Sequence, residues 1–274
     1  MTKLPQRIAF LLLLIGAVSA QAFAQKDGKD TLACREWQSD GSRANHCEIK
    51  EQTVSVSGGV IKVDGRQNGG VSVKGWERNE ILVRARIQTT APNQSEADSL
   101  ASQIVINTSG ANIFASGPEN RKGHSWSVSF EVFVPTRSDI SLQSHNGGIS
   151  ISDVHGRLDF QAVNGGVVLN RVGGSVHGGT TNGGLVVQLS GDRWDGEELD
   201  VKTTNGGINM SVPANYSAHL ETGTVNGSLK IGFPVTVQGE ITRELAVNLG
   251  SGGPTIRART TNGGVSINRS GMVF

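Results

Sequence analysis

The string TTNGG occurs three times in this chain, at Thr180–Gly184, Thr203–Gly207 and Thr260–Gly264. Three identical strings of five residues in a chain of 274 indicate a repeated structural unit. Asn and Gly adopt positive φ angles most readily, as a sharp corner between two strands requires. The β-branched Thr favours the extended strand that leads into such a corner. The string therefore predicts the same strand and corner at several places in the fold.

The repeat is most regular between residues 146 and 190, where its period is nine residues. The five blocks read NGGISISDV, HGRLDFQAV, NGGVVLNRV, GGSVHGGTT and NGGLVVQLS. An apolar residue stands fourth in each block, and a second follows two residues later, except where Gly178 replaces it. This alternation indicates short strands with every second side chain inward. Asn opens only every other block, which indicates a longer period of 18 residues.

We expect these blocks to form an all-β fold, a flattened parallel β-solenoid or β-helix with two nine-residue repeats per coil of about 18 residues. Equivalent Asn side chains at the corners are expected to stack into a ladder of amides. The structural turns expected to carry them are at Asn146, Asn164, Asn182, Asn205, Asn226 and Asn262. The alternative is a series of local hairpins, for which Asn-Gly is a strong signal, but hairpins leave the longer period unexplained.

The first 24 residues have the features of a secretory signal peptide. Lys3 and Arg7 precede an apolar run from Ile8 to Val18, and Ala22-Phe23-Ala24 fits a small-x-small cleavage site. The run is too short to span a bilayer comfortably, and we expect no transmembrane segment after cleavage. The sequence therefore predicts an exported protein that is periplasmic, on the cell surface or extracellular.

Composition narrows the class of protein further. Without the signal peptide, 23 Lys and Arg side chains face 24 Asp and Glu, so no excess of positive charge indicates a nucleic acid partner. Gly accounts for 37 residues, and the apolar 36% of the chain lies in short alternating runs, as in all-β proteins. The only cysteines, Cys34 and Cys47, are expected to form a disulfide in an exported protein.

The chain divides by its sequence patterns into four segments. These are the signal peptide (1–24), an N-terminal segment with the disulfide (25–53), a first β region (54–135) and the regular NGG-repeat solenoid (136–274). One helix is expected near residues 95–104, where Ser95 and Asp98 form a capping box and Leu100 and Ile104 share a face. We expect this helix to cover an open end or face of the solenoid.

Several longer strings occur together in the order typical of a known family. They are GGVIKVDGRQNGGVSVKGWERNEILVRARI, the helix, VSFEVFVPTRSDISLQSHNGGISISDVHGRLDFQAVNGGV, and the later TTNGG and TVNGSL. On these strings the chain resembles the bacterial putative-adhesin family of exported β-strand-repeat proteins, over roughly residues 55–267. The resemblance implies a β-helix-like fold outside the cytoplasm. It implies no reaction, and the family offers no catalytic residues to transfer.

The loop at residues 191–198 departs from the nine-residue pattern and carries a suggestive group of side chains. Trp194 stands there between two acidic residues, Asp192 and Asp195. An aromatic face with hydrogen-bond acceptors beside it is typical of a sugar-binding surface. We therefore name these three residues as the candidate binding site. The alternative is that Trp194 folds back over the edge of a coil.

Two functions remain open at this point. The first is a non-catalytic, adhesin-like envelope or surface module, whose rigid solenoid contacts a polymer or a protein. The second is a polysaccharide lyase or hydrolase on a β-helix scaffold, which needs a basic residue beside carboxylates. Asp153, Arg157 and Asp159 do not recur in register and are expected to be a solvated face. Two or more carboxylates with a basic residue in one groove would favour the enzyme.

We favour the surface module over the enzyme. The expected partner is a cell-surface or matrix polysaccharide, or an envelope protein, and not a nucleic acid. We expect no catalytic residues, no cofactor and no metal, because none of the six His residues has the spacing of metal ligands.

Overall fold

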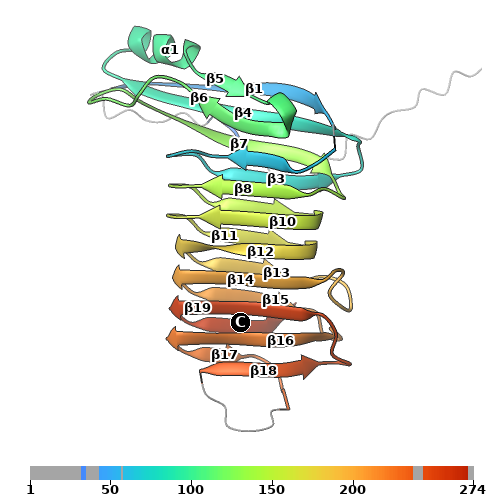
Figure 1. Cartoon of the computed structure of the whole chain (residues 1–274). Helices are drawn as coiled ribbons and strands as arrows, with labels where there is room; N and C mark the ends of the chain where they lie inside the picture. Colours follow the sequence, from blue (N-terminus) through green and yellow to red (C-terminus); the bar gives the residue numbers. More distant parts are fainter. Residues whose placement is uncertain (1–31, 35–42, 57, 237–242, 271–274) are drawn as a thin grey trace, which may run out of the picture. The chain divides into compact units, whose positions relative to one another are not determined.

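The computed structural model of the protein describes residues 32–34, 43–56, 58–236 and 243–270 (Figure 1). The predicted signal peptide lies outside these residues. The chain from Leu32 onward belongs to one compact unit. Its described part consists of strands with one α-helix and one short 3-10 helix, η1 (Ser109–Ala111). The predicted all-β class is confirmed, whereas the division at residues 53 and 135 stays a prediction.

The strands form two ten-stranded sheets, which we call sheet A and sheet B. In spatial order, sheet A contains β1 (Ala44–Ser55), β4 (Glu80–Ala91), β7 (Ser125–Pro135), β3 (Val71–Trp76), β9 (Ile149–Ser152), β11 (Val167–Asn170), β13 (Leu185–Gln188), β15 (Ile208–Val212), β20 (Val265–Arg269) and β17 (Leu229–Ile231). Sheet B contains β18 (Glu244–Leu249), β16 (Ala218–Asn226), β19 (Thr255–Asn262), β14 (Glu198–Asn205), β12 (Gly173–Asn182), β10 (His155–Ala162), β8 (Ile140–Ser144), β2 (Ile61–Asp64), β6 (Asn112–Ser116) and β5 (Val105–Asn107).

Each coil of the chain contributes one strand to each sheet, and the strands of neighbouring coils pair in parallel. Leu158 in β10 pairs with Ile140 and with Val176, each 18 residues away. From β12 to β14 the offset between paired residues grows to 23, as Thr180 and Thr203 show, because the loop at 191–198 intervenes. Parallel neighbours cannot be joined by a tight hairpin, so the hairpin alternative is wrong for this region.

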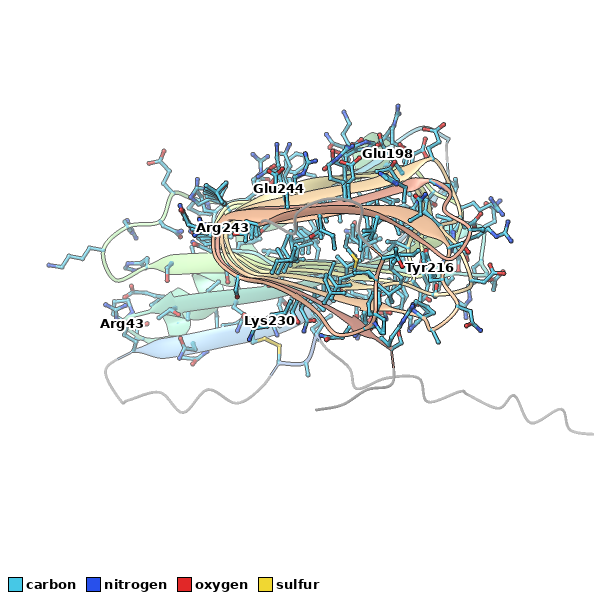
Figure 2. The ribbon with its side chains drawn as sticks, turned by 90° about the horizontal axis from the view of Figure 1, so that it is seen from below. Arg43, Glu198, Tyr216, Lys230, Arg243 and Glu244 are labelled. Atoms are coloured by element: carbon cyan, nitrogen blue, oxygen red, sulfur yellow. A yellow bond between two sulfur atoms is a disulfide. The ribbon has the colours of Figure 1, made fainter. Side chains whose placement is uncertain are left out.

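The core lies between the two sheets and is filled by alternate side chains of each strand. Seen along the stack (Figure 2), the sheets form two layers, and Glu198 and Lys230 lie on opposite outer faces. The one break in the apolar pattern has a packing reason. Gly178 pairs in register with Phe160, and a Cβ on Gly178 would lie 2.7 Å from the Phe160 ring. The aromatic ring therefore fills the space that Gly178 leaves.

The Asn residues of the repeat form a continuous column at one corner of the coils. Each side-chain amide donates to the side-chain carbonyl of the neighbouring Asn, over 2.8–3.1 Å. The column runs in the order Asn68, Asn146, Asn164, Asn182, Asn205, Asn262 and Asn226. Six of these are the Asn residues expected at the structural turns, and Asn68 extends the ladder by one coil.

The first Gly after each Asn allows the coils to approach closely at this corner. A Cβ on Gly165 would lie 2.2 Å from the carbonyl oxygen of Gly147, and one on Gly183 would lie 2.2 Å from that of Gly165. Neither residue has a positive φ, so the expectation of left-handed backbone at these two corners is wrong. Glycine is needed here because a side chain would collide with the neighbouring coil. The second Gly is less constrained, since Ser228 occupies its place in one coil.

The first Thr of each TTNGG string points inward and ties two coils together. The hydroxyls of Thr180, Thr203 and Thr260 each donate, over 2.7–2.8 Å, to the carbonyl of the first Gly of the neighbouring coil. All three residues are buried, so their hydroxyls would otherwise lack a partner. The string thus combines an inward Thr, an amide of the ladder and a Gly that lets the coils touch.

One end of the stack consists of antiparallel strands and the helix. β4 pairs antiparallel with β1 and β7, and α1 (Gln94–Ser102) packs against β1 and β4 (Figure 1). The predicted N-cap, Ser95, is wrong. Asn93 caps the helix, because its side chain accepts a hydrogen bond from the Glu96 N–H. At this end Cys34 and Cys47 form the predicted disulfide, which joins residue 34 to β1.

The two corner glycines of one repeat provide a matched test of this packing. We expect Gly183→Ala to lower the free energy of unfolding by about 1–3 kcal/mol, because the new Cβ would overlap the Gly165 carbonyl. Gly184→Ala should change it by less than about 1 kcal/mol, since its Cβ would lie 3.4 Å from the nearest atom. Urea unfolding of both variants measures the difference. Equal losses would contradict the close contact at the first Gly.

Candidate functional site

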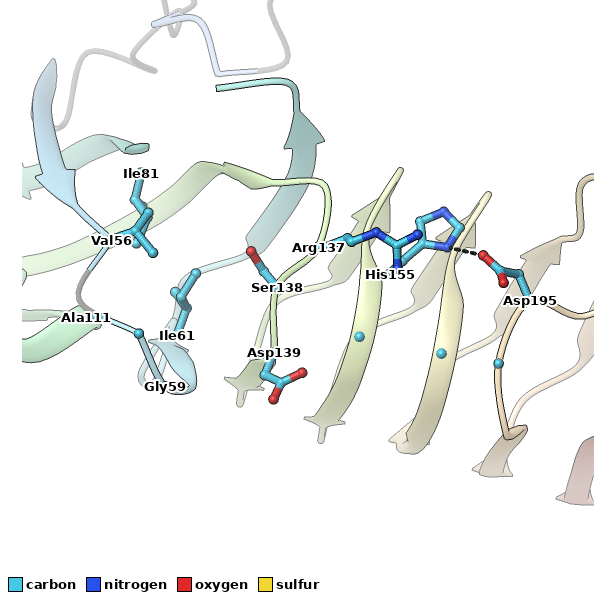
Figure 3. A pocket seen from close by; sticks show the side chains of 14 residues that line it. Val56, Gly59, Ile61, Ile81, Ala111, Arg137, Ser138, Asp139, His155 and Asp195 are labelled. Carbon is cyan, nitrogen blue, oxygen red and sulfur yellow. Dashed lines mark ion pairs between the residues drawn. The ribbon is translucent and has the colours of Figure 1, made fainter. Parts of the chain in front are cut away.

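A groove follows the stack at a second corner, where the strands of sheet B begin (Figure 3). Its volume is about 520 Å³. Its polar side chains come from the segment before β8, from β10 and from the loop before β14, and they are Arg137, Ser138, Asp139, His155 and Asp195. Its other end is apolar, lined by Val56, Ile61 and Ile81. The groove therefore joins residues from successive coils into one elongated surface.

Three glycines from successive coils line the groove. A Cβ on Gly156 would lie 2.4 Å from the Ser138 carbonyl oxygen, one on Gly174 would lie 2.1 Å from that of Gly156, and one on Gly196 would lie 2.2 Å from that of Gly174. Gly174 also has a φ of 101°, which other residues rarely adopt. Only glycine fits at these positions, because a Cβ would collide with the backbone of the neighbouring coil.

His155 and Asp195 form a side-chain contact within the groove. The His155 Nδ1 atom lies 3.2 Å from Asp195 Oδ2, drawn as the dashed line in Figure 3. This contact is within ion-pair range, although its alignment is not that of a hydrogen bond. The pair can form because the residue next to His155 in the register is Gly173, on which a Cβ would lie only 2.5 Å from His155 Nδ1.

Arg137 supplies the groove with an exposed positive charge. It is exposed, and no carboxylate in the described part of the chain forms an ion pair with it. Figure 3 places its side chain beside His155. Asp139 forms a hydrogen bond within the fold, since its Oδ1 accepts from the backbone N–H of Arg157 over 2.8 Å. The groove thus offers an exposed cation beside a His–Asp pair.

The candidate binding residues of the 191–198 loop are separated by the structure. Trp194 is only 3% exposed, and its indole N–H donates to the Gly174 carbonyl over 3.0 Å. A buried ring cannot stack on a sugar, so Trp194 is a structural residue, as the alternative expected. Asp195 does line the groove, whereas Asp192 is exposed outside it and contacts Arg193.

The loop is fastened to the coils on both sides of Trp194. The Gly174 N–H donates to the Asp195 carbonyl, and the Ser217 N–H donates to the Asp192 carbonyl. Tyr216 is buried beside the loop, and burial raises the pKa of its phenol, with a further contribution from the negative charges of Asp192 and Asp195. The loop therefore holds Asp195 at the groove by backbone hydrogen bonds and a packed Trp.

A second polar hollow, of about 610 Å³, lies on the outer face of sheet B. Of its three Lys and Arg side chains, Arg257 and Arg259 form ion pairs, whereas Lys202 forms none with the described carboxylates. Arg257 lies 3.0 Å from Asp200 and 2.9 Å from Glu221, and its hydrogen bond holds the pKa of Glu221 below the usual range. Arg259 also contacts Glu221. The two Arg side chains of this hollow are therefore engaged within the protein, whereas Arg137 of the corner groove has no ion-pair partner among the described residues.

Two further features bear on the type of site. Within the described ranges, no group of three or more His, Cys, Asp and Glu side chains is placed to hold a metal ion. No helix among the described residues has the length and apolar character needed to cross a membrane.

Sequence reasoning missed Arg137, Asp139 and His155 as groove residues. The signal was available in the 18-residue period. Arg137 precedes His155 by 18 residues, and the two form an isolated parallel bridge. Applying the same offset upstream of the regular blocks would have aligned Arg137 with His155. The position of Asp195 depends on the path of the inserted loop, which the period does not predict.

The sequence matches the model of the family described as Toastrack DUF4097 over residues 48–268. The chain therefore belongs to the Toastrack DUF4097 family. Among curated proteins, none matches this sequence.

Solved structures with a similar arrangement include two bacterial proteins. One is described as a putative cell adhesion protein from Clostridium sporogenes ATCC 15579, with 11% identity, a TM-score of 0.44, and coverage of 82% of this chain and 100% of that one. The other is described as a putative adhesin from Bacteroides fragilis NCTC 9343, with 12% identity, a TM-score of 0.38, and coverage of 82% and 97%.

Replacing Trp194 separates its structural role from a role in binding. We expect Trp194→Ala to lower the free energy of unfolding by about 3–5 kcal/mol, because it removes a buried aromatic side chain. Asp192→Ala should change it by less than about 0.5 kcal/mol, since that side chain is 75% exposed. Chemical denaturation measures both values. A Trp194→Ala variant as stable as the parent protein would contradict the buried position of the ring.

Proposed function

We propose that this protein is an exported, adhesin-like surface module that holds an extended polymer in its corner groove and has no catalytic role. The observation that carries the proposal is the course of the groove, which crosses successive coils along the stack. An elongated groove with repeated spacing suits a chain molecule better than a compact metabolite, which usually binds in an enclosed pocket.

The chemistry of the groove indicates which polymer would bind. Arg137 is an exposed cation without an ion-pair partner among the described residues, so it is free to bind a carboxylate, sulfate or phosphate group. Asp195, with its side chain 76% exposed, can accept hydrogen bonds from hydroxyl groups. We infer that the ligand is a polysaccharide that carries acidic groups as well as hydroxyls.

The scaffold supports this role by being repetitive and rigid. We propose that its unit is a coil of two nine-residue repeats, since residues 18 apart pair in register from β8 to β12. The amide ladder and the inward Thr hydroxyls hold neighbouring coils at fixed spacing. Groups presented along the groove are thereby organised before the ligand arrives, which reduces the entropic cost of binding. The disulfide supports an export route to an oxidising compartment.

A polysaccharide-acting enzyme remains the second candidate, and one observation favours it. The groove contains two carboxylates, Asp139 and Asp195, together with Arg137 and His155. In Figure 3 the Asp139 carboxylate lies apart from the His155–Asp195 pair, so these polar groups do not converge on one point. Convergence is what general acid–base catalysis of glycoside cleavage requires. Binding is therefore the better supported function.

Binding of polygalacturonate, with neutral dextran as the comparison, tests the proposal. We expect Arg137→Ala to weaken polygalacturonate binding about 5- to 30-fold, because a charge-assisted contact is lost. Its unfolding free energy should stay within about 0.5 kcal/mol of the parent value, since the side chain is exposed and has no ion-pair partner in the described ranges. Calorimetry or surface plasmon resonance gives the affinities.

Arg157→Ala is the matched control, because it removes the same charge from a neighbouring coil outside the groove. Its affinity should stay within about twofold of the parent value. Equal weakening by both variants would show a diffuse charge effect and contradict the groove. Absence of any binding would contradict the acidic polysaccharide. Release of polygalacturonate fragments that His155→Ala abolishes would establish the enzyme instead.

A further inference from the structure

One coil of the stack stands out of sequence order. β19 and β20, which we call the inserted coil (Thr255–Arg269), lie between the coil of β14 and β15 and the coil of β16 and β17. Both neighbours precede the inserted coil in the chain. All the strands that receive it are therefore present in residues 198–231, which are continuous in sequence. We call the space that it occupies the slot.

The inserted coil is held in the slot on both sides by parallel pairing. β19 pairs with β14 and β16, and β20 pairs with β15 and β17. Its corner also completes the column. Asn262 donates to the Asn205 side chain and accepts from that of Asn226. Without it, the amide ladder would be broken between the two neighbouring coils.

The core depends on the same segment. Ile256, Ala258, Val265 and Ile267 are each at most 1% exposed. If the inserted coil left, β14 and β16 would face each other across a space about 10 Å wide, twice the usual strand spacing. Their backbone N–H and C=O groups would then lack hydrogen-bond partners, and the apolar residues beneath them would lose their packing contacts. Such an edge is a template for adding a strand of matching pattern.

The link to the inserted coil is short and rich in glycine. It runs from Gly250 to Pro254, between β18 and β19. Gly250 and Gly252 have φ angles of 53° and 75°, and β18 is itself paired antiparallel to β16. A short hinge between two paired elements favours exchange of the second element between copies, since extending the hinge relieves the tight turn.

We propose that the slot is an acceptor site that a second copy of this chain can fill with its own inserted coil. An identical coil brings the same strand pairs, the same Asn and the same apolar side chains, so each interaction within one chain is replaced by the same interaction between two chains. Exchange then depends on the hinge and on protein concentration. The exchanged dimer would carry two corner grooves, and a polymer that spans both would be held by avidity.

Cysteines at one pair of facing outer positions report the exchange directly. Lys202 in β14 pairs in register with Arg259 in β19, so Lys202→Cys and Arg259→Cys in one chain should form a disulfide within that chain. The test mixes two full-length chains, one with Lys202→Cys and the other, isotopically labelled, with Arg259→Cys. They are unfolded in urea and refolded together, under oxidising conditions, at increasing concentration. Peptide mass mapping then identifies any link between them.

We expect a link between residue 202 of one chain and residue 259 of the other, in an amount that rises with protein concentration. The control pair is Gln143→Cys with Gln161→Cys, which face each other on β8 and β10 within coils that follow in sequence. This pair should give at most one-tenth of the linked product. Equal yields of linked product from both pairs would indicate random collision and would overturn the proposal. A yield from residues 202 and 259 no higher than that of the control pair would overturn it as well.

A hinge variant keeps the proposal testable if the cysteine chains refold poorly. Deleting Ser251 and Gly252 shortens the link, so the inserted coil reaches its own slot less easily. The variant is produced without an unfolding step. Light scattering should show a dimeric fraction at least five times that of the parent chain. A variant that stays monomeric and folded would show that the coil does not exchange.

Discussion

The structure depends on how closely neighbouring coils approach at the Asn-Gly corner. There a backbone carbonyl of one coil lies where the Cβ of the next coil would be, as between Gly165 and Gly183. Only glycine permits this approach. The approach brings the Asn amides within hydrogen-bond distance and lets the inward Thr hydroxyl reach the same carbonyl. Strand register in the coils with an Asn-Gly corner, and with it the position of their inward residues, follows from this contact.

The same constraint shapes the second corner, where the candidate site lies. Gly156, Gly174 and Gly196 stack there as the first corner glycines do. These glycines line the groove, and the polar residues beside them supply its chemistry. The five-residue expansion between β12 and β14 then brings Asp195 against His155. Stacked glycines and one insertion together place the polar side chains of the groove.

Much of the fold could be predicted from the sequence, because the repeat itself specifies it. The alternation of apolar residues gave the strands, and the recurrence of Asn gave the ladder. The predicted reason for the first Gly of each corner, a positive φ angle, was wrong. A close carbonyl contact and a positive φ angle both require glycine, so the sequence alone does not distinguish them. The insertion of β19 and β20 between earlier coils was also missed, because residues 203–207, 224–228 and 260–264 carry nearly the same string. Trp194 could be read as either exposed or buried until its partner, the Gly174 carbonyl, was known.

The most direct test of the corner contact compares two adjacent threonines. Thr203→Val removes the buried hydroxyl that donates to the Gly183 carbonyl over 2.8 Å and keeps the shape of the side chain. Thr204→Val makes the same change at an exposed position. Urea unfolding should show a loss of about 1–2 kcal/mol for Thr203→Val and less than about 0.5 kcal/mol for Thr204→Val. Equal stability of the two variants would contradict the corner contact as the interaction that holds the coils together.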